Sequence, residues 1–293
     1  MSPPDDPADP DHPADSAWQR LGSAAEFARR RLAGDYAVDE SGFDPDLNAA
    51  VLMPAARLLY RDWFRVRMRG LANVPESGPA LVVANHSGVL PFDAVMLQAG
   101  VFDEHPCHRN LRLLSADLVS ALPVLASLAR RSGHVRADPD VAHGLLSSGE
   151  LVGVFPEGFK GIGKPFSQRY RLQRFGRGGF AVTAMRARVP IIPCAIVGAE
   201  EIYPMIGNAA AAARLLRLPY FPVTPLFPWL GPLGAVPLPS NWIIEFCEPV
   251  PTDGFAPDQS DDHEVISGLA DTVKETIQRK LDELLQQRGP AFG

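Results

Sequence analysis

The chain has 293 residues and a formal net charge of -6, a balance that argues against a general nucleic-acid-binding protein. Its composition, 46% hydrophobic and 21% charged, is typical of a soluble globular protein that is long enough to bury a sizeable core. The three cysteines form no CxxC pair, which excludes a disulfide scaffold and a zinc ribbon and fits a reducing cytoplasm. We predict one large domain with short additions.

The first additions lie at the N-terminus. Residues 1–15 are rich in Pro and Asp and are predicted to be a disordered tail, without the basic and apolar regions of a secretory signal. Residues 16–34 have a Ser cap, helical spacing and a Gly stop. Residues 48–70 form a second amphipathic pattern with five arginines. This helical segment, residues 16–70, is expected either to pack on the domain or to lie on an anionic membrane surface.

The remainder, residues 71–293, alternates short apolar runs with helical patterns. Buried strands are predicted at residues 79–85, 111–116, 151–155, 191–198 and 242–249. Helices are predicted near residues 94–100, 117–129, 139–148, 177–188 and 262–288. Such alternation indicates an α/β fold with a mostly parallel or mixed central sheet flanked by helices.

One segment of this domain, residues 215–239, is apolar and almost uncharged. Its prolines recur every few residues, so that it cannot form an ordinary membrane-spanning helix. Its aromatic residues suit either an acyl-chain groove or the membrane interface, and an irregular core segment is the plain alternative.

A histidine and an aspartate follow the first predicted strand, in the stretch HSGVLPFD. His86 stands where the strand ends, and Asp93 is expected in the first turn of the next helix, after Pro91. If the loop folds back, the carboxylate holds one imidazole nitrogen and leaves the other free to accept a proton. This is the arrangement of a general base, although a structural histidine is the commoner role for a lone His–Asp pair.

Three further blocks follow in order. Arg136 comes after a turn with Gly in SGHVRADPD, FPEG immediately follows the strand at residues 151–155, and a proline-punctuated strand begins near Val189. The ordered set resembles the glycerophospholipid acyltransferase family, which contains lysophosphatidic acid and glycerol-3-phosphate acyltransferases. The resemblance covers about residues 71–198. The family's box has four residues between His and Asp, whereas this chain has six.

The resemblance implies roles for particular residues. His86 would be the general base and Asp93 the carboxylate that orients it. Arg136 would approach the phosphate of the acceptor. The residues implied in the acyl-acceptor site are Phe155, Pro156, Glu157, Gly158 and Lys160. The same resemblance implies a glycerol-phosphate acyltransferase-like fold.

The chemistry of acyl transfer agrees with this implication. A thioester donor is already activated, so the enzyme needs only to deprotonate a hydroxyl and hold it beside the thioester carbonyl. No G-x-S-x-G elbow occurs, which argues against an α/β-hydrolase esterase. No cofactor is expected, and acyl-CoA or acyl carrier protein would be the co-substrate.

Two other features bear on ligands. Residues 159–188 contain eight basic residues and no acid, a local positive field that would attract phosphates or simply form a solvated basic face. The HPCH stretch contains His105, Cys107 and His108 but lacks a fourth ligand at a recognised spacing, so no metal site is expected.

The sequence therefore predicts an O-acyltransferase. It would move a fatty acyl group to a lysophospholipid or glycerol-phosphate-type acceptor, in phospholipid biosynthesis. We expect a cytoplasmic protein, peripheral at the inner face of the membrane and without a nucleic-acid partner. The alternative, motivated by the longer box, is a catalytically silent lipid-binding relative of the same fold.

Overall fold

A computed structural model describes residues 13–87, 90–115, 123–158, 161, 163–215 and 221–292. Its centre is a seven-stranded sheet with the strand order β1-β9-β6-β2-β5-β3-β4. The pair β9 and β6 is antiparallel, and the other neighbours are parallel. The strands are β1 (Arg67–Arg69), β2 (Ala80–Ala84), β3 (Leu111–Ser115), β4 (His134–Arg136), β5 (Leu151–Val154), β6 (Ile191–Val197) and β9 (Ile243–Phe246). The predicted mixed, mostly parallel sheet is confirmed.

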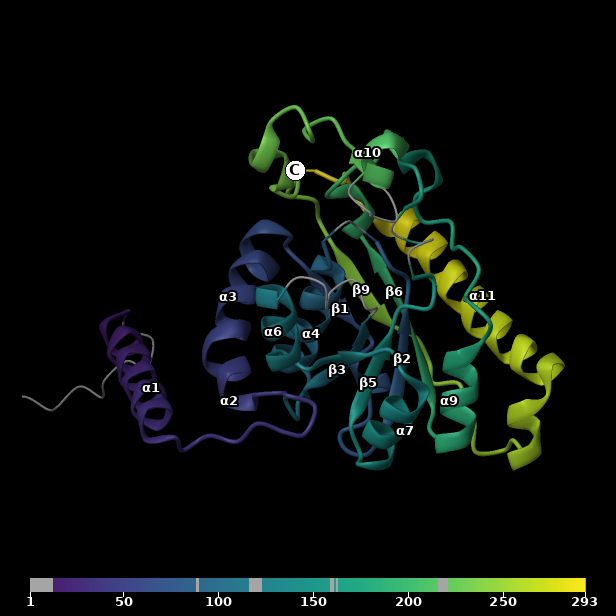
Figure 1. Cartoon of the computed structure of the whole chain (residues 1–293), viewed down its shortest axis with the longest axis horizontal. Coiled ribbons are helices and arrows are strands. Elements are labelled where there is room, and N and C mark those ends of the chain that lie inside the picture. The colour runs from purple at the N-terminus through teal and green to yellow at the C-terminus, as the bar shows by residue number, and fades with distance from the viewer. Residues whose placement is uncertain are drawn as a thin grey trace, which may run out of the picture.

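Helices cover both faces of this sheet (Figure 1). On one side lie α3 (Met53–Arg57), α4 (Phe92–Glu104) and α6 (Pro123–Arg131), and on the other lie α7 (Pro139–Ser147), α9 (Gly179–Ala187) and α11 (His263–Gln287). Side chains alternate along β2, with Val82 in the core beneath α4 and Val83 in the core beneath α9 and α11. All five residues of β2 are buried, which explains its uninterrupted apolar sequence.

The second N-terminal helix packs on the domain. It runs through α2 (Pro45–Leu47), a π-helix (Asn48–Leu52), α3 and a second π-helix (Leu58–Trp63). Met53 and Tyr60 are buried, and Arg57 pairs with Asp103 of α4 at 2.6 Å. The arginine-rich surface of this helix is therefore joined to α4 by an ion pair as well as by apolar contact.

This helix ends earlier than its sequence pattern predicts. Residues 67–69 form the edge strand β1, which pairs in parallel with β9. In the turn between helix and strand, Arg65 has a positive φ of 45°. Its side chain is held by a hydrogen bond from Nε to Asn241 Oδ1 at 2.6 Å. Neither β1 nor β4 was predicted from the sequence, and each has only three residues. Such lengths are too short for a periodic pattern.

The proline-rich segment adopts irregular structure where it is described. Residues 222–223 form β8 (Pro222–Val223), which pairs with β7 (Gly207–Asn208), and a 3-10 helix spans Gly231–Ala235. This segment lies at the top of Figure 1, near α10 (Ala210–Leu215). Within the described parts of the chain, no helix has the length and apolar character needed to cross a bilayer.

Asn85 fixes the point at which β2 ends. Its side chain is fully buried and bonds to β6 twice: Nδ2 donates to the Ile196 carbonyl at 2.9 Å, and Oδ1 accepts from the Ile196 N–H at 2.7 Å. The amide thus continues the ladder between β2 and β6 with side-chain atoms. It also fixes the main chain immediately before His86.

We predict that Asn85→Ala destabilises the protein. The substitution leaves a buried donor and a buried acceptor of Ile196 without partners, so the free energy of unfolding should fall by about 2–4 kcal/mol. Urea denaturation measures this change. Gln286→Ala, which removes an exposed amide on α11, is the control and should remain close to wild type. Equal stability of Asn85→Ala and wild type would contradict the role of this side chain.

Candidate active site

The structure brings His86 and Asp93 together. His86 Nδ1 lies 2.7 Å from Asp93 Oδ2, and Asp93 is in the first turn of α4. Pro91 is the residue immediately before this helix, with Phe92 as its first residue. The six residues between His86 and Asp93 therefore do not separate the pair, because the chain returns to the end of β2 as it enters α4.

The Asp93 carboxylate also binds the main chain around it. Oδ2 accepts from the Ser87 N–H at 2.8 Å, and Oδ1 accepts from the Ala94 N–H at 2.8 Å. The Asp93 side chain is fully buried, whereas the His86 side chain is 19% exposed. A buried ionised carboxylate only accepts hydrogen bonds, so the neutral imidazole donates through Nδ1–H. Nε2 is then left as the proton acceptor.

Two opposing effects set the pKa of His86. Burial lowers the pKa of the imidazole, but the negative charge and the hydrogen bond of Asp93 raise it by more. The result is a pKa above the ordinary value of 6.5. Because the charged form of His86 is favoured in the folded state, this group stabilises the fold fully below pH 6.5. That contribution is lost as the pH rises through the higher, folded-state pKa.

The FPEG block forms one wall beside the imidazole. The Phe155 ring stacks on the His86 ring, with centroids 4.6 Å apart and an angle of 27° between the planes. Pro156 and Gly158 are half-buried on the same turn, and Gly158 has a positive φ of 53°. Glycine suits this turn because other residues rarely adopt that conformation. Lys160, the other residue implied in this block, lies outside the described residues.

The Glu157 side chain points into the protein and is not exposed to an acceptor. Its side chain is fully buried, and its two oxygens bind two separate loops. Oε1 accepts from the His86 N–H at 3.2 Å, and Oε2 accepts from the Gln173 N–H at 2.7 Å. This geometry makes Glu157 a brace for the main chain of His86.

A buried ion cluster lies behind this brace. Lys164 Nζ is 2.9 Å from Glu200 Oε1 and 3.8 Å from Glu157 Oε2, and it donates to the Arg171 carbonyl at 3.2 Å. Two carboxylates thus face one ammonium. Burial raises the pKa of Glu200 to about 7, against the opposing influence of Lys164. The loop that carries Gln173 is consequently joined to the FPEG block by charge as well as by hydrogen bonds.

Arg136 lies at the same edge of the sheet but farther along it. It is the last residue of β4 and is exposed. Strands β2 and β4 are three positions apart in the sheet order. At about 4.8 Å per step, their main chains are about 14 Å apart. The structure therefore places Arg136 apart from the His86–Asp93 pair.

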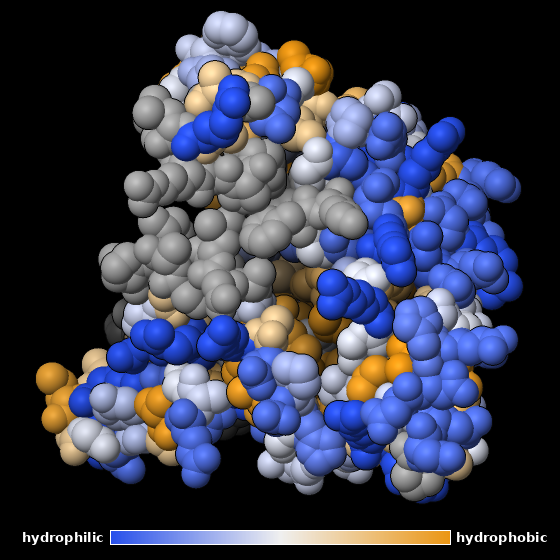
Figure 2. All heavy atoms as spheres, turned by 45° about the vertical axis from the view of Figure 1, so that its right-hand side comes forward, coloured by the Kyte–Doolittle hydropathy of each residue, from blue (hydrophilic) through white to orange (hydrophobic). Residues whose placement is uncertain are grey.

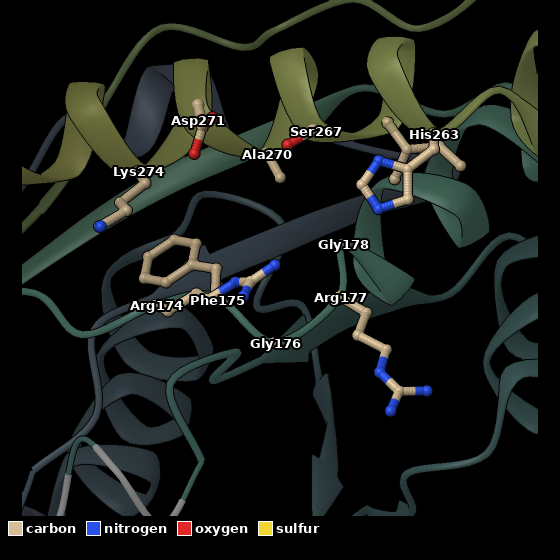
Figure 3. A pocket seen from close by; sticks show the side chains of 11 residues that line it. Arg174, Phe175, Gly176, Arg177, Gly178, His263, Ser267, Ala270, Asp271 and Lys274 are labelled. Carbon is tan, nitrogen blue, oxygen red and sulfur yellow. The ribbon is translucent and has the colours of Figure 1, made fainter.

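The basic stretch of residues 159–188 is partly neutralised. Lys164 is in the buried cluster, and Arg186 pairs with Asp261 at 2.7 Å. Arg188 donates to the main-chain carbonyl of Asp253 at 2.7 Å, which is an uncharged acceptor. Arg174 and Arg177 line a surface crevice against α11 (Figure 3). The positive field of residues 159–188 is therefore weaker than the sequence alone indicates.

The residues that line this crevice do not include His86. The other charged or titratable groups around it are His263, Asp271 and Lys274 of α11. Figure 3 shows Lys274 and Arg177 extending toward opposite sides, so the cations do not converge on one point. The loop that carries Arg174 is linked to the His86 site through the preceding residue, Gln173, whose main-chain N–H donates to Glu157.

The HPCH stretch has an internal hydrogen-bond network. His105 is buried; its Nε2 lies 3.2 Å from the Val74 carbonyl, and its Nδ1 accepts from the Cys107 N–H. His108 Nδ1 lies 2.8 Å from the Phe102 carbonyl. Among the residues that the structure describes, no group of three or more His, Cys, Asp or Glu side chains is arranged to hold a metal ion.

Four supporting groups were not predicted from the sequence. The Asn85 side chain and the Gln173 main-chain N–H hold the loops on either side of the site, and the side chains of Lys164 and Glu200 complete the buried cluster. Only Asn85 left a readable signal, because it stands directly before His86 in the box. Lys164 appeared as one more charge of the basic stretch, and its burial depends on tertiary contacts.

Known proteins are similar to this chain in sequence and in fold. A family model described as Acyltransferase matches residues 65–197. Two proteins called uncharacterized, from Mycobacterium tuberculosis and Mycobacterium leprae, are 56% and 53% identical to this chain over 274 and 280 residues. These alignments cover 94% and 96% of this chain and 76% of each relative. The chain belongs to the acyltransferase family.

More distant similarities agree with this family. The bovine protein named DGAT1/2-independent enzyme synthesizing storage lipids is 24% identical to this acyltransferase over 221 residues, 75% of this chain and 60% of that protein. The fold matches the crystal structure of the 1-acyl-sn-glycerophosphate (LPA) acyltransferase PlsC from Thermotoga maritima. Its TM-score is 0.55 with 18% identity, over 94% of this chain and 99% of that one. The resemblance to glycerophospholipid acyltransferases is confirmed.

We predict that Glu157→Gln in this acyltransferase lowers kcat more than it raises the KM for the acceptor. One amide N–H₂ must then face a main-chain N–H, so the loop that carries His86 shifts. A displacement near 1 Å costs about 100-fold in rate. Steady-state kinetics separate the two parameters.

The matched control is Glu264→Gln, which removes an exposed carboxylate from the first turn of α11 and should leave both parameters unchanged. A raised KM with unchanged kcat would contradict the brace and assign Glu157 to direct contact with the acceptor.

Proposed function

We propose that this acyltransferase moves a fatty acyl group from a thioester donor to the hydroxyl of a lysophospholipid or glycerol-phosphate-type acceptor. His86 is the general base and Asp93 orients it. The observation that carries the proposal is the 2.7 Å contact between His86 Nδ1 and the buried Asp93 carboxylate. This contact leaves Nε2 to receive the hydroxyl proton.

The reaction follows from this arrangement. Nε2 takes the proton as the acceptor oxygen attacks the thioester carbonyl carbon, forming a C–O bond. The C–S bond then breaks, and the departing thiolate takes the proton from Nε2–H. Asp93 stabilises the imidazolium between these two steps. No covalent acyl-enzyme intermediate is required, and the products are an ester and a free thiol.

The raised pKa of His86 has a consequence for the pH dependence. The base must be neutral to accept a proton, and the neutral fraction increases as the pH rises through the pKa. Because that pKa lies above 6.5, the acidic limb of kcat/KM is expected above this value. A higher pKa also makes Nε2 a stronger base once it is deprotonated.

The acceptor is proposed to bind along the edge of the sheet between β2 and β4. Arg136 at the end of β4 is assigned to a phosphate of the acceptor, and Phe155, Pro156 and Gly158 to the wall beside its reacting hydroxyl. Lys160 is assigned to the same wall because it follows the FPEG block by two residues. Glu157 acts in this site through the main chain of His86. The similarity in fold to the 1-acyl-sn-glycerophosphate (LPA) acyltransferase PlsC supports this acceptor class.

The donor is proposed to be acyl-CoA or acyl carrier protein. A thioester supplies the activation that the reaction needs, so no cofactor or metal is assigned. We further propose that the protein acts in phospholipid biosynthesis as a cytoplasmic, peripheral protein at the inner face of the membrane. Water-insoluble acceptors are presented at that surface.

The silent lipid-binding relative is the less supported alternative. Its motive is the longer box, and the six intervening residues do not separate His86 from Asp93. The observed pair, with Glu157 bound to the same loop, provides the parts that the reaction needs.

We predict that the purified protein releases thiol from long-chain acyl-CoA when an acceptor is present, and that His86→Ala lowers kcat/KM by at least about 100-fold, the usual contribution of a general base. The acceptor panel contains lysophospholipids and glycerol-3-phosphate, and acyl carrier protein is the second donor. His143→Ala, an exposed histidine of α7, is the control and should retain full activity.

No acceptor-dependent release with either donor, from a folded protein, would overturn the proposal in favour of the silent relative. Release that persists in His86→Ala would remove His86 from the reaction.

A further inference from the structure

An exposed apolar surface lies beyond the carboxyl end of β6. We call it the apolar cap and define it by five side chains that are 47–73% exposed: Ile206, Trp229, Leu230, Leu233 and Val236. Single exposed apolar residues are ordinary, but a group of large ones on one segment indicates an interaction surface. In Figure 2 a few hydrophobic atoms are visible at the top of the molecule, among hydrophilic ones, and the right-hand side is mainly hydrophilic.

The cap is held together by main-chain contacts. The Ile206 N–H donates to the Val223 carbonyl at 2.9 Å, and the Leu238 N–H donates to the Ile202 carbonyl at 3.0 Å. The segment at residues 221–239 contains six prolines, which restrict its main chain. Its apolar side chains are therefore presented by a stiff scaffold, and little conformational entropy is lost when they bind.

The charge of this region is one-sided. Residues 202–241 contain two arginines, Arg214 and Arg217, and no lysine or acidic residue. The whole chain, in contrast, has a net charge of -6. A segment that exposes aliphatic residues and tryptophan and has no acidic residue in its sequence fits the headgroup region of an anionic bilayer.

The cap is also connected to the proposed site. The Tyr203 hydroxyl donates to the Ala235 carbonyl at 2.5 Å, and the Tyr203 ring lies 6.3 Å from the ring of Phe92. Phe92 directly precedes Asp93 at the start of α4. On the other side, Trp63 Nε1 donates to the Pro237 carbonyl at 3.0 Å. The cap and the His86–Asp93 pair therefore lie at the same end of the sheet.

We propose that the apolar cap inserts into the headgroup region of an anionic bilayer and holds the His86 site against the surface that presents its lipid substrates. The proposal deepens the proposed function and rests on it for the identity of the substrates. The exposure of the five side chains favours this role over the lining of an enclosed acyl-chain groove.

Vesicle sedimentation tests the cap directly. The purified full chain is mixed with vesicles of phosphatidylcholine and phosphatidylglycerol, or of phosphatidylcholine alone. We expect wild type to sediment with the mixed vesicles and to bind the neutral ones less. The double variant Trp229→Ser, Leu233→Ser should bind the mixed vesicles at least about 10-fold more weakly, since two large apolar side chains no longer insert. Circular dichroism verifies that the variant is folded.

The matched control is Val38→Ser, Val141→Ser, which removes two exposed apolar residues from other elements and should bind as wild type does. His86→Ala should also bind as wild type does, so a failure of the catalytic proposal is distinguishable from a failure of the cap. Wild type that does not sediment with mixed vesicles would overturn the inference, as would equal binding by the cap variant. Loss of a dimer in the cap variant, without vesicle binding by wild type, would assign the surface to a second copy of this chain.

Discussion

The site depends on one buried carboxylate. Asp93 accepts hydrogen bonds from the His86 side chain, from the Ser87 main chain and from Ala94 at the start of α4. These bonds join the end of β2 to the beginning of the helix that follows it. A carboxylate inside a protein needs such donors, and here the loop supplies two of them by returning to Asp93. The two additional residues of the box are therefore accommodated without loss of the pair.

The remaining contacts hold this loop from the other sides. Asn85, the residue before His86, is bonded to β6 through its side chain. The Glu157 carboxylate joins the main chain of His86 to the loop at Gln173. Phe155 restricts the imidazole by stacking on it. Each contact comes from the carboxyl end of a neighbouring parallel strand, which is where α/β folds gather their functional side chains. The position of His86 is thus determined by the sheet order β6-β2-β5.

Much of this arrangement was predictable because strong local patterns coincide with it. Long apolar runs revealed the five longest strands of the sheet, and the HSGVLPFD and FPEG stretches identified both walls of the site. The short edge strands β1 and β4 have no period to read, since their pairing is set by the adjacent strands β9 and β3. The burial of Glu157 and Lys164 likewise depends on residues far away in sequence, including Glu200.

The most direct test of this account is the titration of the His86 imidazole by NMR, assigned by comparison with His86→Gln. The account predicts a pKa above 6.5 in wild type, because Asp93 outweighs burial. In Asp93→Asn the charge is lost while burial remains, so the pKa should fall below that of wild type. A wild-type pKa at or below 6.5, or a pKa unchanged by Asp93→Asn, would contradict the claim that Asp93 orients the imidazole and raises its pKa.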